Sequence, residues 1–538
     1  MSTDKAATAS APMGAVPLDG IPGLMQNIKF DLPAGLIIFL IALPLSLGIA
    51  VASGAPPIAG VITGFIGGIL GGLLGGSYVT INGAAAGLIA IVFGAVSALS
   101  DIGPNGQPDL ATGFRHALAV GVICGGFQIL MGLAKMGKLT NMFPLSVVHG
   151  MLAGIGIGIG IIIMAKQIHT LLGVKVAGAM IPTIAAIPSS FANMNTQAAT
   201  IGALSLVMMM IWPKLPKAIT KLVPAPMAII MVTVPMAMMM KLSPDLMVKV
   251  PLAFMESFQT PDWSKAGTGV FWKFVITYTL VASLESLLTA AAMDKMDPWK
   301  RRSNMNRELV SKGAANALSS FIGGLAMIAE VVRSSANIMN GARTRWSNIC
   351  HGSFLLLSVA FIPQILNMIP LAALAGMLVF IGSRLAHYKK FVHAAHVGKE
   401  EVAYMLVTTF FVVTVDLLWG IIIGFIVAVL FNIVRGGFSV KADAKVEANG
   451  DAVTVKLKGT HGFLNFMSMR GILDALPQGK KLTIDYTGVT YMDHTVHERF
   501  HDFDAEYAAG NGTVRTVGKE ALSPTSHSKV SALVRAKA

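Results

Sequence analysis

The stretch "MIAEVVRSSANIMNGARTRW", residues 327–346, places a glutamate and an arginine between two apolar runs at 309–322 and 347–363. Glu330 and Arg333 are three residues apart, so on a helix their side chains lie on one face and can pair. Ionisable groups are expensive to bury in an apolar environment, and inside a membrane they mark functional sites by default. The stretch therefore predicts a charged site within a membrane protein.

The composition supports a membrane protein over its whole length. The chain has 538 residues, of which 54% are hydrophobic and only 13% are charged, whereas soluble domains carry about 25% charged residues. Several apolar runs, such as 35–53 and 270–293, reach the roughly 20 residues that are needed to cross a bilayer. These features predict a polytopic α-helical membrane protein.

The formal net charge of +14 does not indicate a nucleic-acid partner. Lys and Arg lie mostly in short loops between apolar runs, without the interleaved aromatic residues on which single-stranded nucleic acid stacks. An excess of basic residues on the cytoplasmic side explains the charge instead. No nucleophile–base set and no phosphate-binding loop is recognisable, so we expect neither an enzyme nor a bound cofactor.

Hydropathy predicts fourteen apolar segments, and loop charge predicts their orientation. With the N-terminus inside, the basic loops fall on the cytoplasmic side and the loop 101–114, which has no Lys or Arg, falls outside. Both termini are then cytoplasmic, and the location is the inner (plasma) membrane. The segments are 35–53, 58–75, 83–99, 115–134, 142–165, 198–212, 224–240, 270–293, 309–322, 329–340, 347–363, 369–386, 400–415 and 417–434.

Two of these segments are too short to span a bilayer alone. One follows "SYVTINGAAAGL" (77–88) and is the third in order. The other begins near "MIAEVVRSSANI" (327–338) and is the tenth. Each is therefore third within its half of a seven-plus-seven arrangement, which is the sequence sign of a transporter site at a repeat interface. Their helix N-termini are expected to face each other and to attract an anion.

The remaining chain divides by composition into three further parts. Residues 1–28 are rich in Ala, Ser, Pro and Gly and are expected to be a flexible tail before a transmembrane domain at 29–436. Residues 437–525 alternate like β-structure and contain one helical stretch, which predicts a small cytoplasmic α/β domain. Residues 526–538 are expected to be a C-terminal tail.

A second acidic residue lies inside an apolar helix. Glu285, in "VASLESLLTA", has Thr289 four residues on and therefore on the same helical face. A carboxylate in this environment can exchange protons near neutral pH, and its hard oxygen atoms also suit a metal cation. Glu285 is therefore predicted to be a functional acidic residue rather than a structural one.

Five stretches carry a resemblance to a known family, the SulP anion permeases, which include bicarbonate and sulfate transporters and prestin. The resemblance extends from about residue 28 to about 520. It implies a fourteen-segment inverted repeat with core and gate domains that moves as an elevator in homodimers, followed by a cytoplasmic STAS domain. The stretches are "GLIIFLIALPLSLGIAVASGAPPIAGVITGFIGGILGGLLGGS" (35–77), "ESLLTAAAMD" (285–294), "NRELVSKGAANALSSFIGGL" (306–325), "RSSANIMNGARTRW" (333–346) and "IPLAALAGMLV" (369–379).

The resemblance also implies an anion site between the starts of the third and tenth segments. In this sequence its residues are Asn82, Gly83, Ala84 and Ala85, then Ala329, Glu330, Val331 and Arg333, with Leu43 and Ser46 from the first segment. Two departures stand out. "NGAAAG" (82–87) replaces a Gly-Pro-Thr-Gly stretch, and Glu330 replaces a small or hydroxyl residue. Glu330 would repel an anion unless it pairs with Arg333, is protonated or turns away.

The resemblance predicts a secondary active transporter of a small inorganic anion. A carboxylate and a threonine spaced like Glu285 and Thr289 help to hold sodium in the family's bicarbonate importers. The resemblance therefore implies that this pair is a cation-coupling site for sodium or a proton, and it favours bicarbonate as the substrate. Carbonic anhydrase or another cytosolic protein is the implied partner of the STAS domain. The alternatives are a sulfate or dicarboxylate/proton transporter, an anion channel, and a membrane sensor that does not transport.

Overall fold

The computed structural model divides into two compact units. The first comprises Met1–Lys138, Ala165–Gly178 and Pro182–Phe380, and the second comprises Leu139–Met164, Ala179–Ile181 and Ile381–Ala538. The described residues are 15–538 apart from 104–105, 107, 139–144, 177–179, 416, 438, 440, 450–451, 478, 510–511, 527–530 and 536–538. All the residues predicted to form the anion and cation sites lie in the first unit.

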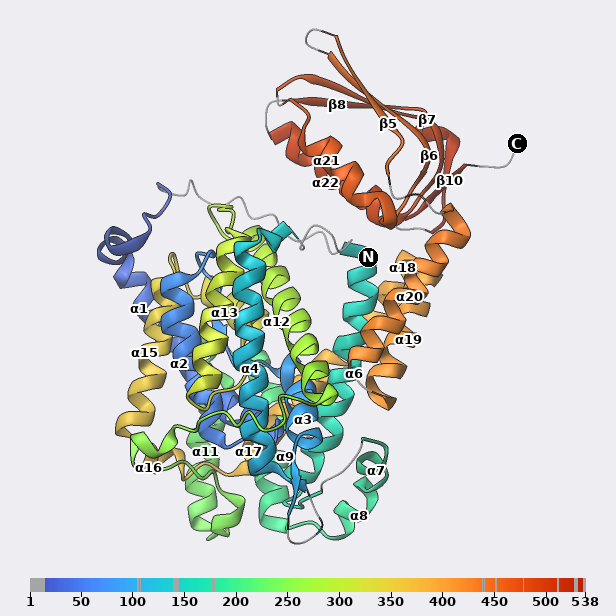
Figure 1. The fold of residues 1–538 in the computed structure, drawn as a ribbon. Coiled ribbons are helices and arrows are strands. Elements are labelled where there is room, and N and C mark those ends of the chain that lie inside the picture. Colours follow the sequence, from blue (N-terminus) through green and yellow to red (C-terminus); the bar gives the residue numbers. More distant parts are fainter. Residues whose placement is uncertain are drawn as a thin grey trace. The chain divides into compact units, whose positions relative to one another are not determined.

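The first unit is helical (Figure 1), and the residues of α6, α7 and α17 are divided between the two units. Its elements are α1 (Gly20–Ala52), α2 (Pro57–Leu74), β1 (Asn82–Gly83), η1 (Ala86–Leu88), α3 (Ile89–Ala98), β2 (Asp101–Ile102), β3 (Pro108–Asp109), α4 (Leu110–Leu133), η2 (Met136–Lys138), α6 (Leu145–Leu171), α7 (Met180–Ala185), α8 (Ile187–Ala192), α9 (Thr196–Ile211), η3 (Trp212–Lys214), α10 (Lys217–Leu222), α11 (Ala225–Met239), η4 (Pro244–Leu246), η5 (Phe254–Ser257), α12 (Gly269–Met296), α13 (Met305–Phe321), β4 (Ile328–Ala329), α14 (Val331–Met339), α15 (Trp346–Phe361), α16 (Pro363–Leu366) and α17 (Leu371–Leu385).

The second unit combines helices with a C-terminal sheet. The sheet runs in the order β5-β6-β7-β10-β9, and β8 also pairs with β7. The pairs β6–β7 and β7–β8 are parallel, and α21 and α22 cover one face of the sheet (Figure 1). The elements are α18 (Lys389–Val397), α19 (Lys399–Thr414), α20 (Leu417–Gly436), β5 (Ala444–Asn449), β6 (Ala452–His461), η6 (Phe463–Asn465), α21 (Phe466–Asp474), β7 (Lys481–Met492), α22 (His494–Ala509), β8 (Thr513–Val517), η7 (Lys519–Ala521), β9 (Leu522–Pro524) and β10 (Leu533–Arg535).

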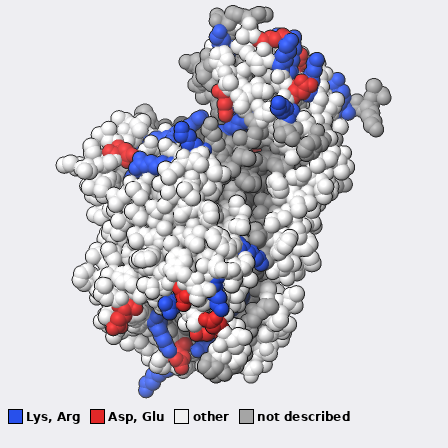
Figure 2. Space-filling view, viewed as in Figure 1, with Lys and Arg blue, Asp and Glu red and all other residues white. Residues whose placement is uncertain are grey.

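Every predicted apolar segment overlaps a helix of the structure. Of the helices within the described residues, six are long and apolar enough to cross a membrane by length and composition. Several others are shorter apolar helices, among them Trp346–Phe361. On the face seen in Figure 2, charged side chains of the first unit gather at the ends of its helices and leave the flank between them nearly uncharged. The helix positions are therefore confirmed, and the count of fourteen crossings stays a prediction.

The expected tails are shorter than the sequence suggested. Residues 1–14 lie outside the described residues, but α1 already begins at Gly20, before the expected boundary at residue 29. The expected C-terminal tail, 526–538, was wrong in part, because β10 lies within it and pairs with β7 and β9. Leu533 of β10 is buried in the core of the sheet. A three-residue strand is too short for an alternating pattern to show.

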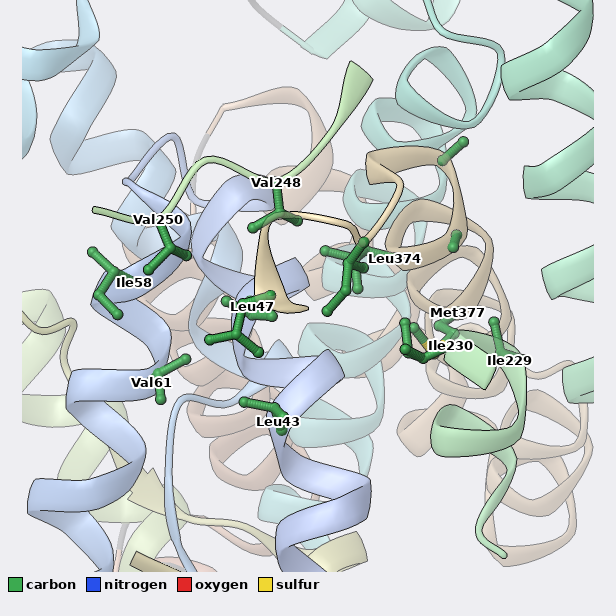
Figure 3. Close-up of a cluster of buried hydrophobic side chains, with 14 of the residues drawn as sticks. Leu43, Leu47, Ile58, Val61, Ile229, Ile230, Val248, Val250, Leu374 and Met377 are labelled. Carbon is green, nitrogen blue, oxygen red and sulfur yellow. The ribbon is translucent and has the colours of Figure 1, made fainter. Parts of the chain in front are cut away.

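An apolar cluster packs α1 and α2 against α11 and α17 (Figure 3). Leu47 of α1, Val61 of α2 and Ile229 of α11 are all fully buried in it. Elsewhere α2 touches α15 backbone to backbone, since a Cβ added to Gly68 would lie 2.5 Å from the Cα of Gly352. Small residues allow such close crossings in membrane helices. This packing fixes the helices that surround the predicted site.

Candidate functional site

The two short segments meet as a two-stranded antiparallel ribbon. Asn82 of β1 faces Ala329 of β4, and Gly83 faces Ile328. The backbone N–H of Glu330 extends the ladder by donating to the carbonyl of Ile81 at 2.9 Å. The ribbon therefore brings together the starts of the third and tenth segments, as the sequence predicted.

Side chains hydrogen-bond to the outer edges of this ribbon. On the β1 side, the N–H of Asn82 donates to Oδ1 of Asn348 at 3.2 Å. On the β4 side, the N–H of Ala329 donates to Oγ of Ser286 at 3.2 Å, and the N–H of Met327 donates to Oδ1 of Asn316 at 2.6 Å. Non-helical backbone at membrane depth is tolerated only where such partners exist. The ribbon is thus a fixed feature of the unit.

Glu330 forms the N-cap of α14. Its extended backbone (φ −106°, ψ 121°) ends the ribbon, and its carboxylate accepts the N–H of Arg333 at 2.9 Å. An acidic group here also interacts favourably with the positive end of the helix dipole. By contrast, no described side chain caps η1 at the entrance to α3. Of the two helix starts that were expected to attract an anion, only that of α3 is without a side-chain cap.

Arg333 is the buried cation of the site, with a side chain only 1% exposed. Its Nη2 donates to the carbonyl of Ala84 at 3.0 Å, and its Nε lies 3.7 Å from Oε2 of Glu330. Of the three alternatives for Glu330, the structure has its carboxylate paired with Arg333. Nε and Nη1 of Arg333 make no hydrogen bond to any described residue. Leaving such donors unsatisfied is unfavourable, and a guanidinium N–H is a strong hydrogen-bond donor to an oxyanion.

Two glycines bring the ribbon and α3 close to the charged groups. A Cβ added to Gly83 would lie 3.1 Å from Nη1 of Arg333, and one added to Gly87 would lie 2.8 Å from Oε2 of Glu285. Glu285 on α12 therefore reaches the first turn of the third segment. Arg333 and Glu285 thus both contact the start of the third segment, and Glu330 joins the group through Arg333.

The other residues that were predicted to form the two sites differ in their burial. Ala84, Ala85 and Ala329 are buried beside the ribbon, whereas Val331, at the start of α14, is 49% exposed. Thr289 is buried on α12 one turn beyond Glu285. A shared cation contact between these two residues stays a prediction.

The α1 residues fall into two groups. Leu43 belongs to the apolar cluster of Figure 3. Ser46 is fully buried, and its Oγ makes no hydrogen bond within the described part of the chain. That hydroxyl lies next to Gly64, whose Cα in turn is 3.5 Å from the Cβ that Gly83 would carry. Ser46 is therefore linked to the ribbon through Gly64, whereas Leu43 packs in the apolar cluster.

Sequence reasoning missed four residues that shape the site. Gly87 makes room for Glu285, and Ser286, Asn316 and Asn348 bind the edges of the ribbon. Gly87 left a weak signal, because a glycine within an apolar helical pattern can mark a close approach of another group. The signal from the three polar residues is also weak, since Ser and Asn in apolar helices also serve ordinary helix packing.

The fold and this ribbon define a helical membrane protein with a transporter fold. The chain superimposes on the transmembrane domain of a cyanobacterial bicarbonate transporter, BicA, with a TM-score of 0.62 at 23% identity. The superposition covers 75% of this chain and 98% of the BicA domain. The chain also matches SLC26A9 with a TM-score of 0.69 at 15% identity, covering 92% of this chain and 85% of that one.

The model of the Sulfate permease family matches residues 28–408, and the chain belongs to this family. Among its relatives, YvdB of Bacillus subtilis (strain 168), named for sulfate transport, is 26% identical over 514 residues, which is 92% of each chain. The bicarbonate transporter BicA of Picosynechococcus sp. is 26% identical over 438 residues, covering 79% of this chain and 74% of BicA.

Proposed function

We propose that this protein is a secondary active transporter of a small inorganic anion, which binds between Arg333 and the start of α3. The observation that carries the proposal is the pair of unpartnered donors on the buried guanidinium of Arg333. An anion there would accept from Nη1, which faces Gly83 at the start of the third segment, and would face the helix end that no described side chain caps. The names of relatives, which include bicarbonate and sulfate transporters, support this class of substrate.

The charges of the site favour coupling to a cation. With Glu285 and Glu330 ionised, Arg333 leaves one net negative charge, and a bound monovalent anion would make it two. Like charges at short range in a protein repel by several kcal/mol, so a proton or sodium ion on Glu285 would relieve the repulsion. The hydroxyl of Thr289 is one turn away on α12. We assign Glu285 and Thr289 to the cation and the ribbon with Arg333 to the anion.

Bicarbonate suits this site better than sulfate does. Sulfate carries two negative charges and no hydrogen-bond donor at neutral pH, whereas bicarbonate carries one charge and a hydroxyl. Glu330 lies 3.7 Å from Arg333, so an anion bound to the guanidinium can present its hydroxyl to this carboxylate. A charge-assisted hydrogen bond would then replace a repulsion. Glu330, which is unfavourable for sulfate, would thus favour bicarbonate.

The proposal includes the architecture that this transport needs. We infer fourteen membrane segments in a seven-plus-seven inverted repeat, with core and gate domains that move as an elevator in a homodimer. The antiparallel pairing of β1 with β4 supports the inverted repeat, because a two-fold axis in the membrane plane would relate the two strands in this way. The region 437–525 is assigned as a cytoplasmic STAS domain, with carbonic anhydrase or another cytosolic protein as its partner. Both termini are placed on the cytoplasmic side of the plasma membrane.

Uptake into proteoliposomes tests the proposal. Purified protein is offered labelled bicarbonate, sulfate, chloride, a dicarboxylate and uracil under imposed Na⁺ or H⁺ gradients. We expect saturable bicarbonate accumulation that requires one of the two gradients. The Glu285→Gln protein should lose accumulation against a gradient while staying folded. Rapid uptake that neither saturates nor depends on a gradient would indicate an anion channel instead, and complete absence of uptake would favour a sensor.

A further inference from the structure

The two edges of β4 contact different parts of the first unit. The backbone N–H of Glu330, which follows β4, faces β1, where it donates to Ile81. The N–H groups of Met327 and Ala329 point the other way, because successive residues of a strand alternate in direction. Their partners are Asn316 of α13 and Ser286 of α12. One edge of β4 therefore builds the proposed anion site, and the other is bonded to α12 and α13.

A second and longer hydrogen-bond path joins β4 to α12. The N–H of Met327 donates to Oδ1 of Asn316 at 2.6 Å, and Nδ2 of Asn316 donates to Oε1 of Gln128 at 2.8 Å. Nε2 of Gln128 then donates to Oγ of Ser283 on α12 at 3.2 Å. The path has one direction only, because turning either amide around would set a donor against a donor.

The path is buried, closely packed and uncharged. Gln128 and Asn316 are 0% exposed, and Ser283 is 2% exposed. It crosses between α4 and α13 close to a backbone contact, since a Cβ added to Gly125 would lie 2.5 Å from the carbonyl oxygen of Gly313. Such packing leaves little slack. The path therefore joins α12 to β4 through buried and closely packed groups.

Glu285 lies between the two points at which α12 contacts this system. Ser283 receives the hydrogen bond of Gln128, and Ser286 receives that of Ala329. We propose that Gln128 and Asn316 are positioning residues that couple the cation site on α12 to the anion site on the β1–β4 ribbon. This inference rests on the proposed function. Cation occupancy at Glu285 fixes α12, and the path through Gln128 and Asn316 then holds β4, with Arg333 following it, in the geometry that binds the anion.

Two variants interrupt the path away from the charged residues. Gln128→Met removes both side-chain hydrogen bonds of residue 128 at similar volume, and Ser283→Ala removes the acceptor on α12. Ser283→Thr keeps a hydroxyl and is the matched control. For each purified full-length protein, equilibrium dialysis in closed vessels gives the affinity for labelled bicarbonate and for labelled sulfate, with and without sodium and at two pH values. The ratio of affinities with and without the cation is the coupling factor.

We expect Gln128→Met and Ser283→Ala to lower the coupling factor toward one, from a wild-type value in the range of about 5 to 150 that is common for linked sites. Anion affinity without the cation should change little, and Ser283→Thr should retain the coupling. Folded variants of both kinds that keep the wild-type factor overturn the inference while leaving the proposed function intact. A wild-type factor of one overturns cation coupling and this inference together. If Gln128→Met fails to fold, Ser283→Ala decides the outcome.

Discussion

The exchange Glu330→Gln separates two roles of residue 330, which caps the N-terminus of α14 and places a negative charge beside Arg333. Glutamine keeps a side-chain oxygen that can accept the N–H of Arg333, which the carboxylate accepts at 2.9 Å. It removes the negative charge that lies 3.7 Å from Nε of Arg333. The fold should therefore lose little, at most about the 1 kcal/mol of an N-cap interaction.

The effect on anion binding should be larger and depends on the anion. A sulfate bound to the Arg333 guanidinium would lie near the carboxylate of Glu330, and two unit charges about 7 Å apart repel by about 2.4 kcal/mol at an effective dielectric of about 20. Removing that repulsion raises affinity by up to about fiftyfold for each unit of anion charge. Bicarbonate should gain less, because the exchange also weakens the hydrogen bond from its hydroxyl to residue 330.

Equilibrium dialysis of the wild type and Glu330→Gln with labelled sulfate and labelled bicarbonate measures both affinities. Glu330→Ala is the control that loses the cap as well as the charge. The reasoning predicts that the ratio of sulfate to bicarbonate affinity rises at least about tenfold in Glu330→Gln, from the charge difference alone. Equal affinities of wild type and Glu330→Gln for both anions would place the bound anion away from Arg333.

Three further perturbations test other parts of the account: a glycine substitution, a truncation and a change of pH. Gly87→Ala puts a Cβ 2.8 Å from Oε2 of Glu285, so it should raise the cation concentration that is needed for half-maximal uptake. The control Gly126→Ala, whose Cβ meets no atom within 4 Å, should leave that concentration unchanged. Equal cation dependence in both variants would refute the assignment of the cation to Glu285. Truncation after residue 436, where α20 ends, should leave a folded protein with measurable uptake in liposomes, and complete loss of transport would make the C-terminal region part of the transport mechanism. Burial lowers the pKa of His461 in β6 from 6.5 to about 4, so the folded state favours the neutral imidazole. The free energy of unfolding should therefore fall by about 3 kcal/mol as the pH drops from 6.5 toward 4. Hydrogen exchange of β6 and β7 in the full chain should show this loss in the wild type and much less of it in His461→Leu, and identical pH profiles would contradict the assignment.

The sequence was informative about elements that obey a simple period. Long apolar runs predict helices through hydropathy alone, so α2 and α12 lie within a few residues of the predicted segments. The alternating pattern after residue 440 likewise predicts β5 and β6. The meeting of the third and tenth segments followed from their length and order.

Other features depend on contacts that a single sequence does not display. The cap formed by Glu330 needs an extended backbone at that residue, and this backbone arises from pairing with Ile81, which is far away in the chain. The roles of Asn316 and Gln128 likewise come from partners on different helices. The chain's own pattern indicated that Glu330 and Arg333 can pair, but not which atoms of Arg333 stay unpartnered.

The most direct test of the anion site is equilibrium binding to protein in which Arg333 is replaced. Arg333→Met keeps much of the side-chain volume and removes the Nε and Nη1 donors that have no partner among the described residues. Its fold is checked by thermal unfolding, because Glu330 loses its buried counter-charge, and breaking such a pair commonly costs about 3–5 kcal/mol. The double variant Arg333→Met/Glu330→Gln removes that strain and serves as the control. We predict that neither variant binds labelled bicarbonate or sulfate while both remain folded. Wild-type affinity in either folded variant would contradict the assignment of the anion to Arg333.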